Sequence, residues 1–473
     1  MSPSGFAFDP TPGEMRAMGR TVLDAVIGWI GGLEDAPAEN TADALQVAAK
    51  LEAAPPEHAD GDFDGLLEDA IEAARNTYEF SGPGYLAYIP GGGLFTAALG
   101  EFLAQALNRF DGLWQPSPAI VQIEENVTRW MCSLFDFPAE TSQGLLTTGG
   151  SLANLSAFVT ARHAKLGEDF LDGAYYCTDQ THASNTKAAT IAGFSRRNLR
   201  LVPTDRELRM DPDALRSMVR EDRAAGRRPF LVIPAVGTTN TGAVDPLADI
   251  ADVAEDEALW MHVDGAYGGF FQLTDRGRER FRGIERADSV TLDPHKGLFL
   301  PYGTGCLLVR DGAALKRAHA LTADYLPAMQ EEEDHVDFCQ ISPELSRDWR
   351  GLRAWLPLKM HGAAAFRESL REKLELARYA ADALRAMPEI EILAEPQLSI
   401  VAFRRAARES AVAADDENRR LLDAVNARGR VHLTGTMLRG RFALRICVLS
   451  FRTHRDRIDA CLEDIRSAIA GLG

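Results

Sequence analysis

The chain has 473 residues, 46% of them hydrophobic and 25% charged, which is ordinary for a globular protein of two or three domains. A formal net charge of −18 disfavours nucleic acid and anionic membranes as partners, and no long basic run reverses it. The sequence has neither a run of about 18 apolar residues nor a basic, apolar leader, so we expect a cytoplasmic protein without a membrane span.

Residues 1–80 predict a helical arm. Residues 14–33 carry apolar side chains three and four positions apart and end at a glycine pair, a pattern typical of an amphipathic helix. A second helix is predicted over 62–80, and a loop rich in glycine and proline follows at 81–93. We expect such an arm to pack on a partner subunit.

Residues 81–345 predict one large domain in which short apolar segments alternate with helices. Helices are predicted at 94–109, 119–135, 211–225 and 246–257, and a short apolar run, a Gly-Gly turn and a helix fill 144–167. Strands are predicted at 174–178, 199–203, 229–237, 259–266, 287–293 and 305–310. This alternation favours an α/β fold with a mostly parallel sheet covered by helices on both faces.

Residues 346–473 predict a small α+β domain. A long helix at 346–386 precedes two further helices and several strands, and the acidic run at 331–335 before it is predicted to be a mobile loop. The six cysteines are scattered, without CxxC or zinc spacing, so we expect buried thiols in a reducing compartment and no metal site.

Chemistry-bearing side chains follow four of the predicted strands. They are His182, Thr238 to Asn240, Asp264, and the pair His295 and Lys296. In parallel sheets, loops at the same edge can converge to form one site. Each feature alone has a structural interpretation: a satisfied core histidine, a β-turn, a helix N-cap or a surface turn. Their combination, with Lys296 lying 32 positions after Asp264, is much less common by chance.

One ligand would use the whole set. A lysine in apolar surroundings is pushed towards the neutral amine, which attacks an aldehyde. A carboxylate can pair with a protonated ring nitrogen, an imidazole offers a flat face, and a helix start after Gly149-Gly150 suits a phosphate. Pyridoxal phosphate carries an aldehyde, a pyridine nitrogen, a ring face and a phosphate, so the sequence predicts this cofactor.

Over nearly its whole length the sequence resembles the group II pyridoxal-phosphate-dependent amino acid decarboxylases, of the aromatic-L-amino-acid and glutamate decarboxylase type. The motifs that carry the resemblance, in the family's order, are GGSLANLSAFVTAR, DQTHASNTKAA, HVDGAYGG, DPHKG and LSRDWRGLRAWL. The resemblance implies a fold type I homodimer with its active site at the subunit interface.

The resemblance also implies roles for individual residues. Lys296 would form the Schiff base, Asp264 would pair with the pyridinium nitrogen, and Ala266 would pack under the ring. His182 would stack on the other face and meet the substrate carboxylate. The residues implied to hold the phosphate are Gly150, Ser151, His295 and Thr239.

The implied reaction is decarboxylation of an L-amino acid to the amine and carbon dioxide. Tyr88, Pro90 and Trp114, in loops rich in apolar residues, could wall an aromatic or bulky apolar side chain, although plain core packing would also explain them. These loops offer no clear arginine or lysine for an acidic substrate. We therefore expect an aromatic or bulky apolar L-amino acid.

Three positions depart from the family pattern. Gly297 replaces the tryptophan that often follows the lysine, which would open space, and Gly112 replaces an aromatic residue near the substrate pocket. The family's mobile loop usually supplies a tyrosine that protonates the substrate carbon. Here Tyr325 comes early in that loop and Phe338 stands near the usual place, unless the loop lengths differ.

These departures leave three alternatives. A phenylalanine at the loop position is associated in relatives with oxidative decarboxylation and deamination to an aldehyde, although His182 favours ordinary decarboxylation. A carbon–carbon lyase of the sphingosine-phosphate lyase type shares the Asp-x-His-Lys element. A cofactor-binding homologue without catalysis is the third, and the intact Lys296, Asp264 and His182 argue against it.

Overall fold

The computed structural model describes residues 8–52, 54–58, 61–321, 324, 335–406 and 411–472. Contacts divide the chain into two compact units. The arm unit comprises Met1–Tyr85, Asp423–His432 and Arg452–Gly473, and the main unit comprises Leu86–Leu422 and Leu433–Phe451. This division differs from the predicted boundaries at residues 80 and 345, which stay a prediction.

The arm unit is helical. Its helices are α1 (Pro12–Gly32), α2 (Ala44–Lys50), α3 (Phe63–Arg75) and α15 (Arg455–Leu472). Thr11 begins α1 with a capping box, because its hydroxyl accepts from the Glu14 N–H and the Glu14 carboxylate accepts from the Thr11 N–H. The predicted helix is therefore present, but no residue of it is buried, and Ile27 on its apolar side is 56% exposed.

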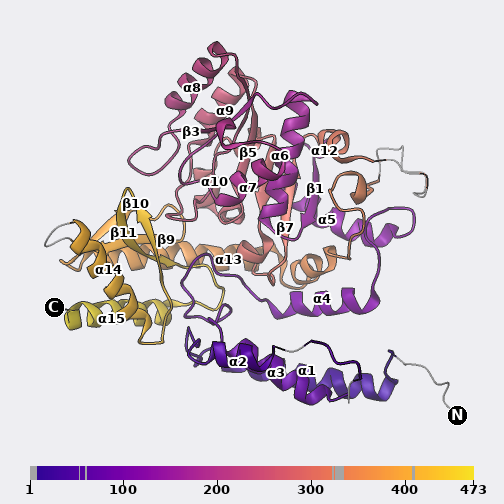
Figure 1. The fold of residues 1–473 in the computed structure, drawn as a ribbon, viewed down its shortest axis with the longest axis vertical. Helices are drawn as coiled ribbons and strands as arrows, with labels where there is room; N and C mark the ends of the chain where they lie inside the picture. The colour runs from indigo at the N-terminus through magenta and orange to yellow at the C-terminus, as the bar shows by residue number, and fades with distance from the viewer. Residues whose placement is uncertain are drawn as a thin grey trace. The chain divides into compact units, whose positions relative to one another are not determined.

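A seven-stranded sheet forms the centre of the main unit (Figure 1). Its strands are β1 (Gln143–Thr147), β2 (Gly173–Cys177), β3 (Leu199–Leu201), β4 (Arg228–Val232), β5 (Trp260–Gly265), β6 (Ser289–Leu292) and β7 (Gly305–Val309). They lie in the order β1-β7-β6-β5-β4-β2-β3. Strand β7 is antiparallel to both neighbours and the other pairs are parallel, which confirms the mostly parallel α/β fold.

The helices of the main unit cover both faces of this sheet. They are α4 (Phe95–Leu107), α5 (Pro118–Leu134), α6 (Gly150–Leu166), α7 (Ala183–Ile191), α8 (Pro212–Ala224), α9 (Leu247–Asp256), α10 (Asp275–Arg280), α11 (Pro294–Gly297), α12 (Gly312–His319) and α13 (Gly351–Arg385). Strand β7 shows why both faces are apolar. Cys306 and Leu308 point into one core cluster, whereas Leu307 and Val309 point into the other.

A second, antiparallel sheet follows in the order β10-β11-β9-β8. Its strands are β8 (Ile390–Ala394), β9 (Ile400–Arg405), β10 (Thr434–Leu438) and β11 (Arg441–Cys447), and α14 spans Ala411–Asn426. All six cysteines are buried and free, as expected for small apolar side chains. Among the described helices, none combines the length and apolarity needed to cross a membrane.

Candidate active site

The carboxyl ends of strands β5 and β6 bring the predicted residues to one edge of the sheet. The two strands are parallel, and their register pairs Asp264 with Thr291. The chain leaves β6 through Asp293 into α11, a helix of four residues that carries His295 and Lys296. Asp264 and Lys296 thus reach the same edge, as the sequence predicts.

A cavity of about 280 Å³ lies at this edge, close to the lower limit of about 300 Å³ for small-molecule sites. Six of the predicted residues line it: Gly150, Ser151, His182, Ala266, His295 and Lys296. The remaining lining residues are Thr148, Gly149, Leu152, Ser184 and Asp293. Three separate segments that follow β1, β2 and β6 therefore meet here with Ala266.

The Lys296 ammonium is compensated by a carboxylate. Its Nζ lies 2.8 Å from Oδ2 of Asp293, and the two side chains are 19% and 4% exposed. This ion pair explains how a lysine is tolerated between two buried segments. The second carboxylate oxygen of Asp293, Oδ1, is buried and has no hydrogen-bond partner among the described residues.

His295 is held by the segment that follows it. Its Nδ1 lies 2.7 Å from the Thr304 carbonyl oxygen, so Nδ1 donates, and Nε2 lies 3.7 Å from Oδ2 of Asp293. Burial lowers the pKa of His295, and the Asp293 carboxylate opposes that shift. The imidazole is therefore fixed in orientation at the floor of the cavity.

Asp264 lies beside the cavity and receives three N–H donors. Its Oδ2 accepts from Asn185 at 2.6 Å and from Asn154 at 3.4 Å, and its Oδ1 accepts from the Ala266 N–H at 3.2 Å. The alternative that Asp264 caps a helix is wrong, because the following short helix has Gly268 as its N-cap.

His182 combines a structural and a cavity-lining position. It is the N-cap of α7, where its Nδ1 accepts from the Ser184 N–H at 3.3 Å and lies 2.8 Å from the Ser184 hydroxyl. The same ring is exposed and borders the cavity. The structural interpretation of this residue therefore holds, and its role at the cofactor stays a prediction.

Comparison with known proteins gives the same family for most of the chain. The profile of the pyridoxal-dependent decarboxylase conserved domain matches residues 45–406. An aromatic-L-amino-acid decarboxylase of Bacillus atrophaeus is 34% identical over 443 residues, covering 93% of this chain and 92% of the relative. A phenylacetaldehyde synthase of Petunia hybrida is 28% identical over 477 residues, covering 96% and 94%.

A crystal structure of Oryza sativa TDC with PLP and tryptamine matches with a TM-score of 0.93 and 27% identity, covering 98% of this chain and 99% of that one. The chain belongs to the pyridoxal-dependent decarboxylase family. It is thus a carboxy-lyase that uses pyridoxal phosphate, as the sequence predicts.

The cavity of this decarboxylase fits that cofactor. The first N–H groups of α6, at Gly150 and Ser151, have no hydrogen-bond partner within the helix. N–H groups at a helix start are suited to bind an anion such as a phosphate. A Cβ added at Gly150 would lie 3.3 Å from the Ala266 methyl and 3.1 Å from the Asp293 carboxylate, so only glycine leaves this cradle open. An amine, a carboxylate and an imidazole complete the donor set that the cofactor needs.

The two glycine departures have a steric explanation. Gly297 does not open space, contrary to the expectation, because a Cβ there would lie 2.6 Å from the Cβ of Phe270, whose ring is buried. At Gly112 a Cβ would lie 2.3 Å from the ring of Phe110. In both places an aromatic side chain fills the volume, from the distant Phe270 at Gly297 and from Phe110 of the same loop at Gly112.

Phe338 is a core residue and not part of an exposed loop. Its ring is fully buried, and the Arg347 guanidinium lies 4.5 Å from the ring centroid. A side chain in this position does not replace a loop tyrosine, so the aldehyde alternative loses its support from Phe338. Tyr325 and residues 331–334 of the predicted loop lie outside the described residues.

Besides Asp264, four predicted residues do not line the cavity. Tyr88 is 55% exposed, Pro90 is buried, and the ring of Trp114 stacks on His335 with 3.9 Å between centroids. The Thr239 carbonyl accepts from Arg445 at 2.6 Å. The substrate-pocket residues and the phosphate role of Thr239 therefore stay predictions.

Asp293, Asn154 and Asn185 also contact the site residues, although they are not among those predicted from the sequence. Asp293 stands in the DPHKG motif, three residues before the lysine, a spacing that places both on one side of a single helical turn. Asn154 and Asn185 lie inside helices and carry no titratable group. Their contacts with Asp264 become visible only when α6 and α7 are placed beside β5 (Figure 1).

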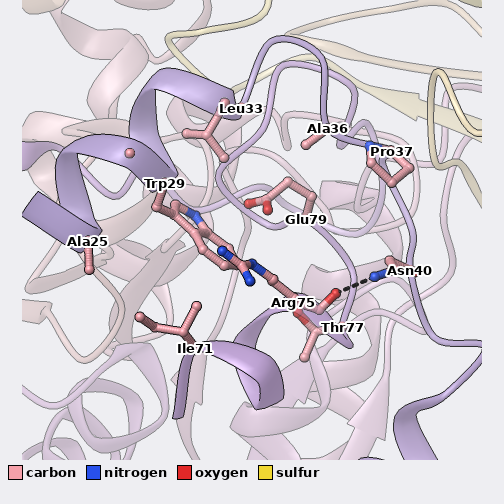
Figure 2. Close-up of a pocket in the computed structure, with 12 residues that line it drawn as sticks. Ala25, Trp29, Leu33, Ala36, Pro37, Asn40, Ile71, Arg75, Thr77 and Glu79 are labelled. Atoms are coloured by element: carbon pink, nitrogen blue, oxygen red, sulfur yellow. Dashed lines mark hydrogen bonds between the residues drawn. The ribbon is translucent and has the colours of Figure 1, made fainter. Parts of the chain in front are cut away.

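A second cavity, of about 470 Å³, lies within the arm unit between α1 and α3 (Figure 2). Trp29, Ile71, Arg75 and Glu79 border it, and the Asn40 amide donates to the Arg75 carbonyl at 2.7 Å. Burial raises the pKa of Glu79. None of the predicted site residues lies in this cavity.

Proposed function

We propose that this protein decarboxylates an aromatic L-amino acid to the corresponding amine and carbon dioxide. The observation that carries the proposal is the cavity in which Lys296, His182 and Ala266 meet the start of α6, with Asp264 beside it. The aromatic substrate is supported by the aromatic-L-amino-acid decarboxylase of Bacillus atrophaeus, which matches over 93% of the chain. No arginine lies among the described residues that line the cavity, and an acidic substrate would need one.

When bound, pyridoxal phosphate supplies an aldehyde that captures the amino group and a ring that accepts the electrons of the broken carbon–carbon bond. Lys296 would hold the cofactor through its Nζ amine. Asp293, 2.8 Å from its Nζ, would hold the Lys296 side chain in position through this ion pair.

The remaining groups would orient the cofactor and the substrate and keep the cofactor ring polarised. Asp264 would hold the ring nitrogen protonated, and its partners Asn154, Asn185 and the Ala266 N–H keep the carboxylate in place. The Ala266 methyl would support one ring face. His182 would cover the other and meet the substrate carboxylate, and the α6 N–H groups would anchor the phosphate.

We propose that two copies of the chain form the working enzyme in the cytoplasm, with the active site at their interface. Helix α4 supports this, because its Leu99, Phe102, Leu103 and Leu107 are 43–71% exposed in the single chain. Helix α1 likewise carries exposed Leu23 and Ile27. In such a dimer, the loops with Tyr88, Pro90 and Trp114 would complete the substrate pocket.

The reconstituted protein, supplied with a panel of L-amino acids, tests the proposal. Released carbon dioxide and the organic product are measured together for tryptophan, tyrosine, phenylalanine, leucine and glutamate. We expect equal amounts of carbon dioxide and amine, with an aromatic substrate turned over fastest. Aldehyde with ammonia and peroxide, or a preference for glutamate, would contradict the proposal.

A further inference from the structure

A chain of buried polar side chains crosses the interior of the main unit and ends at Asp264 and His182. It begins at Trp260 on β5 and passes through Ser289 and His262 to Asn154. The residues Ser289, His262 and Asn154 are each at most 2% exposed to solvent. Buried polar groups are tolerated only when their hydrogen bonds are satisfied, so the direction of each bond can be worked out.

The first bond runs from Trp260, because an indole N–H only donates. Trp260 Nε1 donates to the Ser289 hydroxyl oxygen at 2.8 Å, which leaves the Ser289 proton available to Nδ1 of His262, also at 2.8 Å. Nδ1 of His262 is then an acceptor. Burial lowers the pKa of His262 to about 4, so the ring is neutral near pH 7 and its proton lies on Nε2.

His262 in turn orients Asn154 on helix α6. Nε2 of His262 lies 3.1 Å from Oδ1 of Asn154, which must accept. The Asn154 amide group therefore faces the site, where its two N–H bonds reach the Ser184 hydroxyl at 2.9 Å and Oδ2 of Asp264 at 3.4 Å. A reversed amide would set an oxygen against the Asp264 carboxylate.

Ser184 links Asn154 to His182 by hydrogen bonds of the same direction. Its hydroxyl accepts from Asn154 and donates to Nδ1 of His182 at 2.8 Å, and its backbone N–H donates to the same Nδ1 at 3.3 Å. Two donors thus meet Nδ1 of His182, which leaves the proton of the neutral ring on Nε2.

We propose that His262 and Asn154 are positioning residues, which hold the Asp264 carboxylate in its orientation and keep the His182 proton on Nε2. This inference rests on the proposed roles of Asp264 and His182 at the cofactor. A core histidine that served packing alone would not need hydrogen bonds of a defined direction to Ser289 and Asn154. Here the chain of bonds that begins at Trp260 ends at Asp264, which adjoins the cavity, and at His182, which lines it.

Nitrogen-15 NMR of the cofactor-free protein, labelled at histidine, tests the bond directions without any turnover. The signals are assigned with His182→Gln and His262→Gln. We expect both rings to carry their proton on Nε2 at pH 7. In Ser289→Ala, His262 loses the donor to Nδ1, so we expect a second population protonated there. Thr291→Val removes another hydroxyl of β6, 3.4 Å from Nε2 of His262, and we expect it to keep one tautomer.

The dissociation constant for pyridoxal 5′-phosphate tests the consequence. We expect Asn154→Leu to raise it at least tenfold. Asn418→Leu is the matched control, since Asn418 is equally buried and, within the described part of the chain, bonds to Ala414 of α14 and to Arg405 rather than to a site residue. We expect this variant to lose stability and to bind the cofactor within threefold of the wild type. A proton on Nδ1 of His182, or unchanged affinity in folded Asn154→Leu, would overturn the inference.

Discussion

Gly150 offers the sharpest test of the cofactor cradle. In Gly150→Ala the new methyl would lie 3.1 Å from both Asp293 carboxylate oxygens and 3.3 Å from the Ala266 methyl. Contacts this short force neighbours to shift by a few tenths of an ångström, and overpacking of this kind costs about 1–3 kcal/mol. Without cofactor, the Asp293 side chain can move aside. A bound cofactor would take up the space into which Asp293 could move, so the free-energy cost would fall on the complex.

Since each 1.4 kcal/mol is tenfold in affinity, the variant should bind pyridoxal 5′-phosphate about 5-fold to about 150-fold more weakly. Titration of the cofactor-free protein, followed by fluorescence, measures this. Thermal unfolding without cofactor should change little, because alanine is a better helix former than glycine. Gly19→Ala in α1, where the new methyl meets no atom within 4 Å, is the matched control. If folded Gly150→Ala bound pyridoxal 5′-phosphate within twofold of the wild-type affinity, the inference that Gly150 lines the cofactor site would be refuted.

Three further predictions concern the buried groups of the main unit. Arg347→Met should lower the free energy of unfolding by about 3–5 kcal/mol in urea titrations, because it leaves the fully buried carboxylate of Glu124 without the guanidinium that lies 2.7 Å away. Arg317→Met is the control, because Arg317 pairs with Asp311 at the surface, and it should lower the free energy of unfolding by less than about 1 kcal/mol. Gly297→Ala should cost about 1–3 kcal/mol through its clash with Phe270, and an unchanged midpoint would contradict the packing explanation of this departure. Burial lowers the pKa of His262 from 6.5 to about 4, so between these values the unfolded chain binds more protons. Stability should therefore fall as the pH drops through this window, by on the order of 3 kcal/mol, and His262→Gln should lose this part of the slope.

Much of the fold follows from the sequence because its signals are local. The alternation of apolar strands with amphipathic helices predicts the parallel sheet, and the Gly149-Gly150 pair predicts where α6 begins. The same edge rule places Lys296, Asp264 and His182 together. The family motifs supply the cofactor that joins them.

The remaining features depend on contacts between distant segments. From the sequence, Gly297 is expected to leave space beside Lys296. In the structure Phe270, 27 positions earlier in the chain, fills that space. Phe338 reads as a loop residue because one sequence does not fix the register, whereas the structure buries it under Arg347. Asn154 and Asn185 act through amides, which no charge pattern marks.

The covalent site of the cofactor tests the account most directly. The protein loaded with pyridoxal 5′-phosphate is reduced with borohydride and digested, and the peptides are analysed by mass spectrometry. We expect a pyridoxyl group on the peptide that contains Lys296 and no label in Lys296→Ala. A label on a different lysine, or an equally labelled Lys296→Ala protein, would contradict it.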